Sequence, residues 1–192
     1  MKSCSIIIPA RNEAGTIEAA VLRTPQFCDD LQFVFVEGHS TDSTWSKILR
    51  TKVVHSHRNI WAYQQQGVGK ADAIWLGLRA ALGEIIIILD ADLTVRPEEL
   101  PLFYHHAKEG KFANGTRFKL PMQSGAMPIL NQIANRWFAK RMSALLGVQI
   151  TDALCGTMAF PRKMRPASIV DPFSDFSLLF GAAKAGMPIV DV

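Results

Sequence analysis

The aliphatic run from Ile85 to Leu89 constrains the possible folds of this chain more than any other feature. A strand that is apolar on both faces has to be covered on both sides, which is typical of parallel sheets. The run is also much too short to cross a bilayer. It therefore predicts an α/β fold, in which a mostly parallel sheet lies between layers of helices.

Short β-rich runs alternate with helical patterns along the chain. We expect strands at residues 5–8, 33–36, 52–55 and 85–89. Apolar spacing, an N-cap at Ser40 or Thr41 and Pro97 at a first helical position predict helices at residues 14–22, 41–48, 67–82 and 97–108. This alternation predicts a Rossmann-like sheet, in which ligands bind beyond the carboxyl ends of the strands.

The composition fits one globular domain spanning residues 1–192. Hydrophobic residues make up 48% of the chain and the net charge is +4, which suits an anionic ligand. The three cysteines are widely spaced and predict neither a disulfide framework nor a zinc site. No signal-peptide pattern follows Met1, which favours a cytoplasmic location. The strand-like pattern of residues 188–192 stops without a polar tail, so we expect a truncated C-terminus.

Polar clusters follow three of the expected strands. They are residues 9–13 (PARNE), 37–42 (EGHSTD) and 90–92 (DAD). Because the carboxyl ends of parallel strands meet at one edge of a sheet, we expect these clusters to form a single crevice.

Asp90 and Asp92 carry the most specific chemistry in the sequence. In extended backbone, residues two apart point to the same face, and neighbouring carboxylates repel each other unless a cation lies between them. Mg²⁺ binds carboxylates together with substrate phosphates, and such an ion stabilises a diphosphate leaving group. The alternative is a solvated turn in which one aspartate caps the following segment.

Other polar residues have both a functional and a structural interpretation. The carboxylate of Glu37 can accept hydrogen bonds from a base or ribose, whereas Asp42 equally fits the first turn of a helix. Arg11 is either a phosphate contact or a surface arginine. Residues 67–70 (GVGK) lack the Walker and dinucleotide patterns, but glycines that open a helix before Lys70 make either an anion-binding site or an ordinary helix entry.

Five segments occur in the order and spacing found in family 2 glycosyltransferases. They are residues 5–13 (SIIIPARNE), 36–44 (VEGHSTDST), 67–73 (GVGKADA), 88–92 (ILDAD) and 152–160 (DALCGTMAF). Within that family the chain resembles the dolichol- or polyprenyl-phosphate sugar transferases most. The resemblance implies a GT-A fold and an inverting transfer from a GDP- or UDP-sugar, with Mg²⁺ or Mn²⁺ as the cofactor.

The resemblance and the strand-end positions together suggest individual roles. Contacts to the donor nucleotide are expected from Pro9, Ala10, Arg11, Glu13, Glu37, Lys70, Asp90 and Ala91. Asp90 and Asp92 are the expected metal site, and Asp92 is also a candidate catalytic residue. By resemblance, Arg117 approaches the transferred or acceptor phosphate and Asp152 lies near the acceptor, so both are candidate catalytic residues.

The sequence departs from the family pattern in two places. Glu37-Gly38 replaces a pair of aspartates, and Ser177 stands where the family has a late glutamate, with Asp175 as a candidate replacement base. A phosphate monoester is mostly dianionic at neutral pH and needs no general base, whereas a hydroxyl acceptor does. The missing glutamate therefore favours a polyprenyl or dolichyl phosphate as the acceptor.

Residues 127–146 have an apolar stripe at helical spacing that includes Trp137 and Phe138, with basic residues such as Lys140 and Arg141 on or beside the other face. A basic amphipathic helix with aromatic residues can lie in a membrane interface. The alternative is a helix packed on the core. The first interpretation predicts peripheral contact with the cytoplasmic face of a membrane, and we expect no nucleic acid as a partner.

Three other functions fit part of the pattern. Residues 89–94 (LDADLT) resemble the nucleophile loop of haloacid dehalogenase-type phosphatases, although that loop normally follows the first strand. A sugar nucleotidyltransferase would carry a glycine-rich loop where residues 9–12 (PARN) stand. A non-catalytic domain that binds a nucleotide-sugar without turnover would fit Ser177 and the abrupt C-terminus.

Overall fold

The computed structural model describes residues 2–116, 140–141, 143–144, 147, 150–152, 155–164 and 174–192, without the side chains of residues 174–176. Arg117 and the side chain of Asp175 lie outside this description. So does the expected helix at residues 127–146, apart from residues 140–141 and 143–144.

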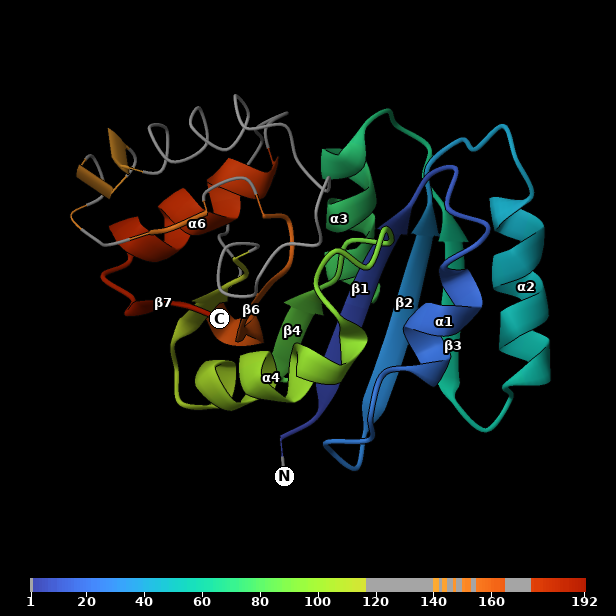
Figure 1. Ribbon diagram of the computed structural model, residues 1–192, viewed down its shortest axis with the longest axis horizontal. Helices are drawn as coiled ribbons and strands as arrows, with labels where there is room; N and C mark the ends of the chain where they lie inside the picture. Colours follow the sequence, from blue (N-terminus) through green and yellow to red (C-terminus); the bar gives the residue numbers. More distant parts are fainter. Residues whose placement is uncertain are drawn as a thin grey trace, which may run out of the picture.

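A seven-stranded sheet forms the centre of the fold (Figure 1). Its strands are β1 (Cys4–Ala10), β2 (Leu31–Glu37), β3 (Asn59–Gln64), β4 (Ile85–Ile88), β5 (Phe112–Asn114), β6 (Met158–Pro161) and β7 (Ile189–Asp191). Across the sheet the order is β3-β2-β1-β4-β6-β5-β7. Strands β1 to β4 are parallel, β5 and β7 are parallel to each other, and β6 is antiparallel to both its neighbours. The expected mostly parallel sheet is confirmed.

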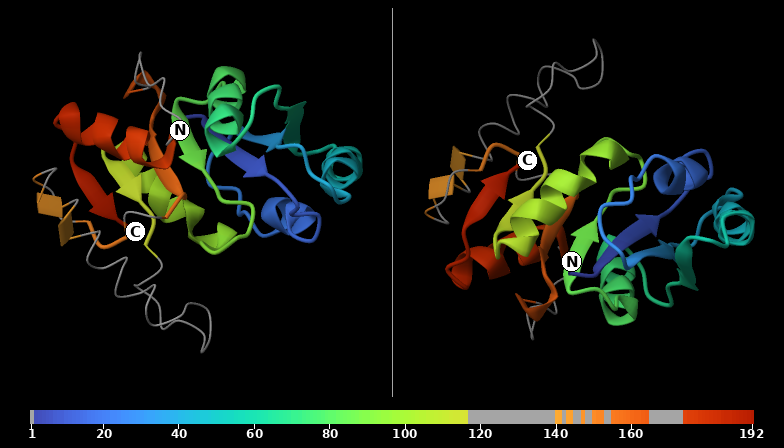
Figure 2. Two further views of the ribbon diagram at one scale, coloured as in Figure 1. Left: turned by 90° about the horizontal axis from the view of Figure 1, so that it is seen from above. Right: turned by 90° about the horizontal axis from the view of Figure 1, so that it is seen from below.

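Helices cover both faces of the sheet (Figure 2). One face packs against α1 (Ile17–Leu22), α2 (Thr44–Val54) and α4 (Leu100–Lys108), and the other against α3 (Lys70–Ala80) and α6 (Ser174–Lys184). Side chains alternate between the two faces along β1, where Ile6 and Ile8 join the first core cluster and Ile7 joins the second. All four residues of β4 are fully buried, as expected for a strand covered on both sides.

The expected strand at residues 52–55 is wrong. Residues 52–54 form the last turn of α2, and β3 begins only at Asn59. The buried residues Thr44, Ile48 and Thr51 recur at spacings of four and three, which is the period of a helix. The adjacent valines at positions 53 and 54 suggested a strand because β-branched residues favour strands, but both are exposed to solvent on the helix.

The ends of several helices also differ from the expected ones. The helix expected at residues 41–48 begins at Thr44 and continues to Val54, and the one expected at 67–82 is the shorter α3. The helix expected at 97–108 opens with a 3-10 turn, η1 (Pro97–Glu99), before α4. No expectation existed for β5, β6, α6 or the 3-10 turn η2 (Arg162–Met164).

The chain changes its direction across the sheet between β1 and β4. From β1 it moves outward to β2 and β3, then returns to form β4 on the opposite side of β1. In open α/β sheets, ligands bind beyond the carboxyl ends of the strands at such a switch point. Residues 9–13 and 90–92 extend from these two strand ends, so the topology brings both expected clusters to the same place.

The C-terminal residues add the edge strand β7, which pairs with β5 from Phe112 opposite Ile189 to Asn114 opposite Asp191. The strand-like pattern at residues 188–192 is therefore a strand. In the stretches of chain that the structure describes, no helix has both the length and the apolar character needed to cross a bilayer.

Candidate active site

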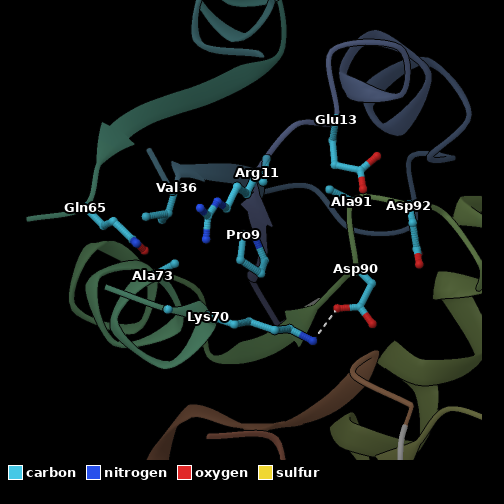
Figure 3. Close-up of a pocket in the computed structure, with 13 residues that line it drawn as sticks. Pro9, Arg11, Glu13, Val36, Gln65, Lys70, Ala73, Asp90, Ala91 and Asp92 are labelled. Carbon is cyan, nitrogen blue, oxygen red and sulfur yellow. Dashed lines mark ion pairs between the residues drawn. The ribbon is translucent and has the colours of Figure 1, made fainter. Parts of the chain in front are cut away.

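A cavity of about 400 Å³ opens at the carboxyl ends of β1, β2 and β4 (Figure 3). It is lined by Pro9, Ala10, Arg11, Glu13, Val36, Gly38, Gln65, Gly69, Lys70, Ala73, Asp90, Ala91 and Asp92. All the residues expected to contact the donor line this cavity, except Glu37. The structure thus brings the expected residues together, while their contacts with a nucleotide stay a prediction.

Lys70 and Asp90 form an ion pair on one wall of the cavity. Lys70 is the first residue of α3, and its Nζ lies 2.7 Å from Asp90 Oδ1 (Figure 3). The backbone of Gly156, just before β6, lies directly against this pair. A Cβ atom at position 156 would lie 2.2 Å from Lys70 Nζ and 2.5 Å from Asp90 Oδ2. Only glycine therefore allows the segment before β6 to approach the pair so closely.

Asp92 lies in a turn and also lines the cavity. Its Oδ1 accepts a hydrogen bond from the Thr94 backbone N–H at 3.0 Å, and the intervening Leu93 has a φ of 55°. Positive φ is uncommon for a residue other than glycine, and such strained backbone often occurs at functional sites. The capped-turn interpretation of Asp92 is therefore correct in part, and it is compatible with a ligand role.

The donor atoms at this end of the cavity fit a hard divalent cation. Among the described residues, no group of three or more His, Cys, Asp or Glu side chains is arranged to hold a metal ion by itself. Mg²⁺, however, is commonly held by one or two carboxylates together with substrate phosphates and water. Asp90 and Asp92 supply two such carboxylates, and Glu13 lies on the same side of the cavity (Figure 3).

The pKa of Glu13 reflects both its burial and the negative charge at this end of the cavity. Burial raises this pKa above its usual value, and the nearby carboxylates of Asp92, Asp42 and Asp90 raise it further, against a smaller opposing effect of a hydrogen bond from Thr16. Carboxylates that repel one another in this way are stabilised by an added cation.

We expect Glu13→Gln to become more stable relative to the wild type as the pH rises. The raised pKa means that the folded state favours protonated Glu13, so the stability this group contributes is present at low pH and is lost as the pH rises through the folded-state pKa. Glutamine does not titrate and escapes this loss. Urea unfolding from about pH 4 to about pH 7 measures the difference.

Glu18→Gln is the matched control for this measurement. The pKa of Glu18 is lowered, first by its hydrogen bond with His55, so this substitution is expected to give the opposite trend with pH. If the free energy of unfolding changed equally with pH in Glu13→Gln and in the wild type, this would contradict a raised pKa of Glu13.

Hydrogen bonds join the segment after β1 to the segment after β2. Asn12 Oδ1 accepts the Thr41 backbone N–H at 2.8 Å, and the Glu13 backbone N–H donates to Thr44 Oγ1 at 2.8 Å. Asn12 and His39, each two residues beyond its strand, have φ angles of 57°. These bonds fix the backbone that presents Glu13 to the cavity. Asp42, whose Oδ1 accepts the Thr44 backbone N–H at 2.9 Å, belongs to the same support.

Glu37 is placed differently from the other expected donor contacts. It is almost fully buried and does not line the cavity. One carboxylate oxygen accepts the Ser40 backbone N–H, and the other accepts Gln64 Nε2 at 2.9 Å. Burial alone would raise the pKa of Glu37, but the hydrogen bonds from Ser40 and Gln64 outweigh this effect and lower it. In this structure Glu37 therefore supports the loop after β2.

Asp152, the residue expected near the acceptor, is fully buried. Its backbone carbonyl accepts a hydrogen bond from Asn114 Nδ2 at 2.9 Å, and the same nitrogen donates to Asp191 Oδ1 at 2.9 Å. Asp191 Oδ2 accepts the Thr151 backbone N–H at 2.7 Å. The ends of β5 and β7 thus hold the segment that carries Asp152, whose role stays a prediction.

Two of the remaining candidate positions, Ser177 and Asp175, belong to α6. Ser177 is a buried residue of α6. Asp175 belongs to the first turn of that helix, but its side chain, like the whole of Arg117, is outside the described residues. The suggested base and the expected phosphate contact therefore stay predictions.

Sequence reasoning missed one side of the cavity wall. Val36, Gly38, Gln65 and Ala73 line it, and none of them was expected as a ligand contact. Val36 and Gly38 flank Glu37, and Gln65 follows directly after β3. The ends of the strands therefore indicated this wall in the sequence. Gln65 was not recognised because the third strand was expected at residues 52–55 and not at Asn59–Gln64.

The mixed α/β fold, with its mostly parallel seven-stranded sheet, is that of the GT-A glycosyltransferases. Residues 5–165 match the family described as Glycosyl transferase family 2. The match covers most of the chain, and the protein belongs to this family.

Two curated relatives are undecaprenyl-phosphate 4-deoxy-4-formamido-L-arabinose transferases. The protein from Aeromonas hydrophila is 26% identical over 173 residues, which cover 88% of this chain and 52% of the relative. The protein from Proteus mirabilis is 28% identical over 153 residues, which cover 78% of this chain and 43% of the relative. The chain thus spans about half the length of these relatives.

The solved structures share the fold at low sequence identity. Glucosyl-3-phosphoglycerate synthase from Mycobacterium tuberculosis, in complex with UDP, has a TM-score of 0.70 and 19% identity, over 99% of this chain and 70% of that chain. The same synthase in complex with Mn²⁺, UDP and phosphoglyceric acid has a TM-score of 0.70 and 18% identity, over 100% of this chain and 68% of that chain.

Proposed function

We propose that residues 1–192 form one glycosyltransferase domain that transfers a sugar from a GDP- or UDP-sugar to a polyprenyl phosphate. The observation that carries this proposal is the cavity at the switch point, where Asp90, Asp92 and Lys70 lie together. The acceptor class is supported by the two relatives, which are undecaprenyl-phosphate sugar transferases.

The acidic end of the cavity is suited to the donor diphosphate. Asp90 and Asp92 would hold Mg²⁺ or Mn²⁺, which would supply positive charge to the diphosphate as it leaves. Mn²⁺ occurs together with UDP in the M. tuberculosis synthase structure. Lys70, with Nζ 2.7 Å from Asp90 in this structure, would donate hydrogen bonds to the same phosphate oxygens.

The acceptor phosphate acts as its own nucleophile in this proposal. One of its oxygens forms a bond to the anomeric carbon while the bond from that carbon to the diphosphate breaks, and the nucleoside diphosphate leaves with the electron pair. A dianionic phosphate has no proton to lose, so Ser177 in place of a glutamate does not prevent the reaction. Attack from the side opposite the leaving group inverts the anomeric configuration.

The test is transfer to a lipid phosphate. The protein is incubated with Mn²⁺, undecaprenyl phosphate and a panel of UDP- and GDP-sugars, and the lipid fraction is analysed by mass spectrometry. We expect a lipid-phosphate sugar and an equal amount of nucleoside diphosphate from one donor of the panel. Donor binding without any product would favour the non-catalytic alternative, and transfer to a sugar hydroxyl alone would contradict the proposed acceptor.

We also propose that the protein works at the cytoplasmic face of a membrane, because its proposed acceptor is a lipid. Co-sedimentation with anionic liposomes tests this location. Protein that stays in the supernatant, although folded, would contradict it.

The phosphatase and nucleotidyltransferase alternatives are set aside. Residues 89–94 follow β4, the fourth strand along the chain, whereas the phosphatase loop normally follows the first strand. The match to Glycosyl transferase family 2 spans both this segment and residues 9–12.

A further inference from the structure

Asp90 belongs to an ion pair and is also one of the two expected metal ligands. Lys70 Nζ lies 2.7 Å from Asp90 Oδ1 (Figure 3). A divalent ion such as Mg²⁺ binds a carboxylate oxygen at about 2.1 Å. On the same oxygen, the ammonium group and the metal ion would therefore be at most about 5 Å apart. Two cations this close repel each other, so Lys70 and a metal ion compete for Asp90.

The segment before β6 restricts Asp90 from another side. The Asp90 backbone N–H donates to Thr157 Oγ1 at 3.3 Å. A Cβ atom at position 156 would lie 2.6 Å from Asp90 Oδ1 and 2.5 Å from Oδ2, so the backbone of Gly156 lies close to both oxygens. The carboxylate therefore has little room to turn away from Lys70 and bind a metal ion elsewhere.

Lys70 is the partner that can change its position. Its side chain is long, lines the cavity and is 36% exposed. As the first residue of α3, Lys70 lies at the positive end of the helix dipole, where a neighbouring anion is favourable. The carboxylate of Asp90 supplies this anion in the structure. A diphosphate at the start of the helix would supply a more highly charged one, with more oxygen atoms to accept hydrogen bonds.

The metal site depends strongly on Asp90 because it has few ligands. Among the residues that the structure describes, no three His, Cys, Asp or Glu side chains are arranged to hold a metal ion. Asp90 and Asp92 are expected to bind it together with phosphate oxygens and water. A cation that neutralises Asp90 therefore weakens one of only two expected protein ligands.

Resting on the proposed function, we infer that Lys70 is a built-in competitor of the metal ion. In the protein without a donor, the ammonium group neutralises Asp90 and keeps the affinity for a metal ion low. The donor diphosphate draws Lys70 away from Asp90, and the freed carboxylate then binds the metal ion more strongly. One side chain thus couples the affinity for the metal ion to the affinity for the donor.

The test is titration of the protein with Mn²⁺, followed by the electron paramagnetic resonance signal of the free ion. Without nucleotide, we expect Lys70→Met to bind Mn²⁺ about tenfold or more tightly than the wild type, since couplings between ligands are commonly of this size. Methionine keeps much of the side-chain length and removes the charge. Lys70→Gln, a second neutral variant, should show the same increase and serves where Lys70→Met does not fold.

The second arm repeats the titration with saturating UDP or GDP. It is corrected for the Mn²⁺–nucleotide complex, which is measured without protein. The wild type should bind Mn²⁺ about tenfold or more tightly in this arm than without nucleotide. In Lys70→Met this gain should be smaller by about the factor gained in the first arm, because no competitor has to leave Asp90.

Lys52→Met and Lys70→Arg are the controls. Lys52 is an exposed residue of α2 that does not line the cavity, and its replacement removes the same charge from the protein. This variant should bind Mn²⁺ within about twofold of the wild type in both arms. Lys70→Arg keeps a cation beside Asp90 and should keep the low affinity of the nucleotide-free protein.

The inference and the proposed function fail in distinguishable ways. If nucleotide-free Lys70→Met and Lys70→Gln bind Mn²⁺ no more tightly than the wild type, or if Lys52→Met shows an equal increase, Lys70 is not a competitor. Equal Mn²⁺ affinity of the wild type with and without nucleotide also overturns the inference. In each of these cases metal binding with nucleotide leaves the proposed function standing. Absence of Mn²⁺ binding in both arms, for the wild type and all variants, would overturn both.

Discussion

Asp92→Asn is expected to lower the rate of sugar transfer by about 100-fold or more. The substitution removes one negative charge from the expected metal site, while asparagine Oδ1 still accepts the Thr94 backbone N–H, so the turn is kept. A metal ion contributes several kcal/mol to stabilising a charged leaving group, and each ~1.4 kcal/mol is a factor of ten in rate. The rate of lipid-linked product formation at saturating donor and Mn²⁺ measures the loss.

Glu84→Gln is the control for Asp92→Asn. Glu84 is an exposed carboxylate directly before β4, at the opposite end of the strand from the cavity. This substitution removes the same charge from the protein and should leave the rate unchanged. An Asp92→Asn rate within about twofold of the wild type, from a folded protein, would contradict a metal role for Asp92.

Gly156→Ala is expected to lower the rate by about 10- to 100-fold without unfolding the protein. The added Cβ atom would lie 2.2 Å from Lys70 Nζ and 2.5 Å from Asp90 Oδ2, so the ion pair has to move. A displacement of about 1 Å in groups that position a reactant can cost on the order of 100-fold in rate. Transfer assays and thermal unfolding, measured on the same sample, separate this effect from a loss of stability.

Gly15→Ala is the matched control for Gly156→Ala. A Cβ atom at position 15 would meet nothing within 4 Å, and this glycine is not among those with positive φ. Both variants add one methyl group at a glycine, but only Gly156 faces the ion pair. Equal activity of Gly156→Ala and Gly15→Ala would show that the Lys70–Asp90 geometry is not needed for transfer.

The secondary structure was predictable in segments whose hydrophobic pattern in the sequence matches their burial in the structure. The run at Ile85–Ile88 is fully buried, as expected. The helix expected at residues 67–82 contains α3, which places Ile74 and Leu78 in the core. The prediction failed at Val53-Val54. The intrinsic preference of valine for strands suggested a strand there, but the helical spacing of the buried residues determines the structure. Strands β5 and β6 have only three and four residues, too few for a periodic signal, and β6 acquires its place from pairing with β4 and β5.

The acidic end of the site was predictable because its residues are continuous with strand ends. Asp90 and Asp92 directly follow a recognisable buried strand, and Lys70 opens a helix. Glu37 also ends a strand, but the sequence does not reveal that Ser40 and Gln64 donate hydrogen bonds to its two carboxylate oxygens. Gln65 was not identified for a similar reason, because its place in the cavity wall depends on where β3 ends.

The central claim is that Asp90 and Asp92 form a metal-dependent site for the donor diphosphate. Calorimetric titration of UDP and GDP into the protein, with and without Mn²⁺, tests this claim most directly. We expect binding of at least one nucleotide that depends on the metal and is lost in Asp92→Asn but kept in Glu84→Gln. Nucleotide binding that needs no metal and is unchanged in Asp92→Asn would contradict the account.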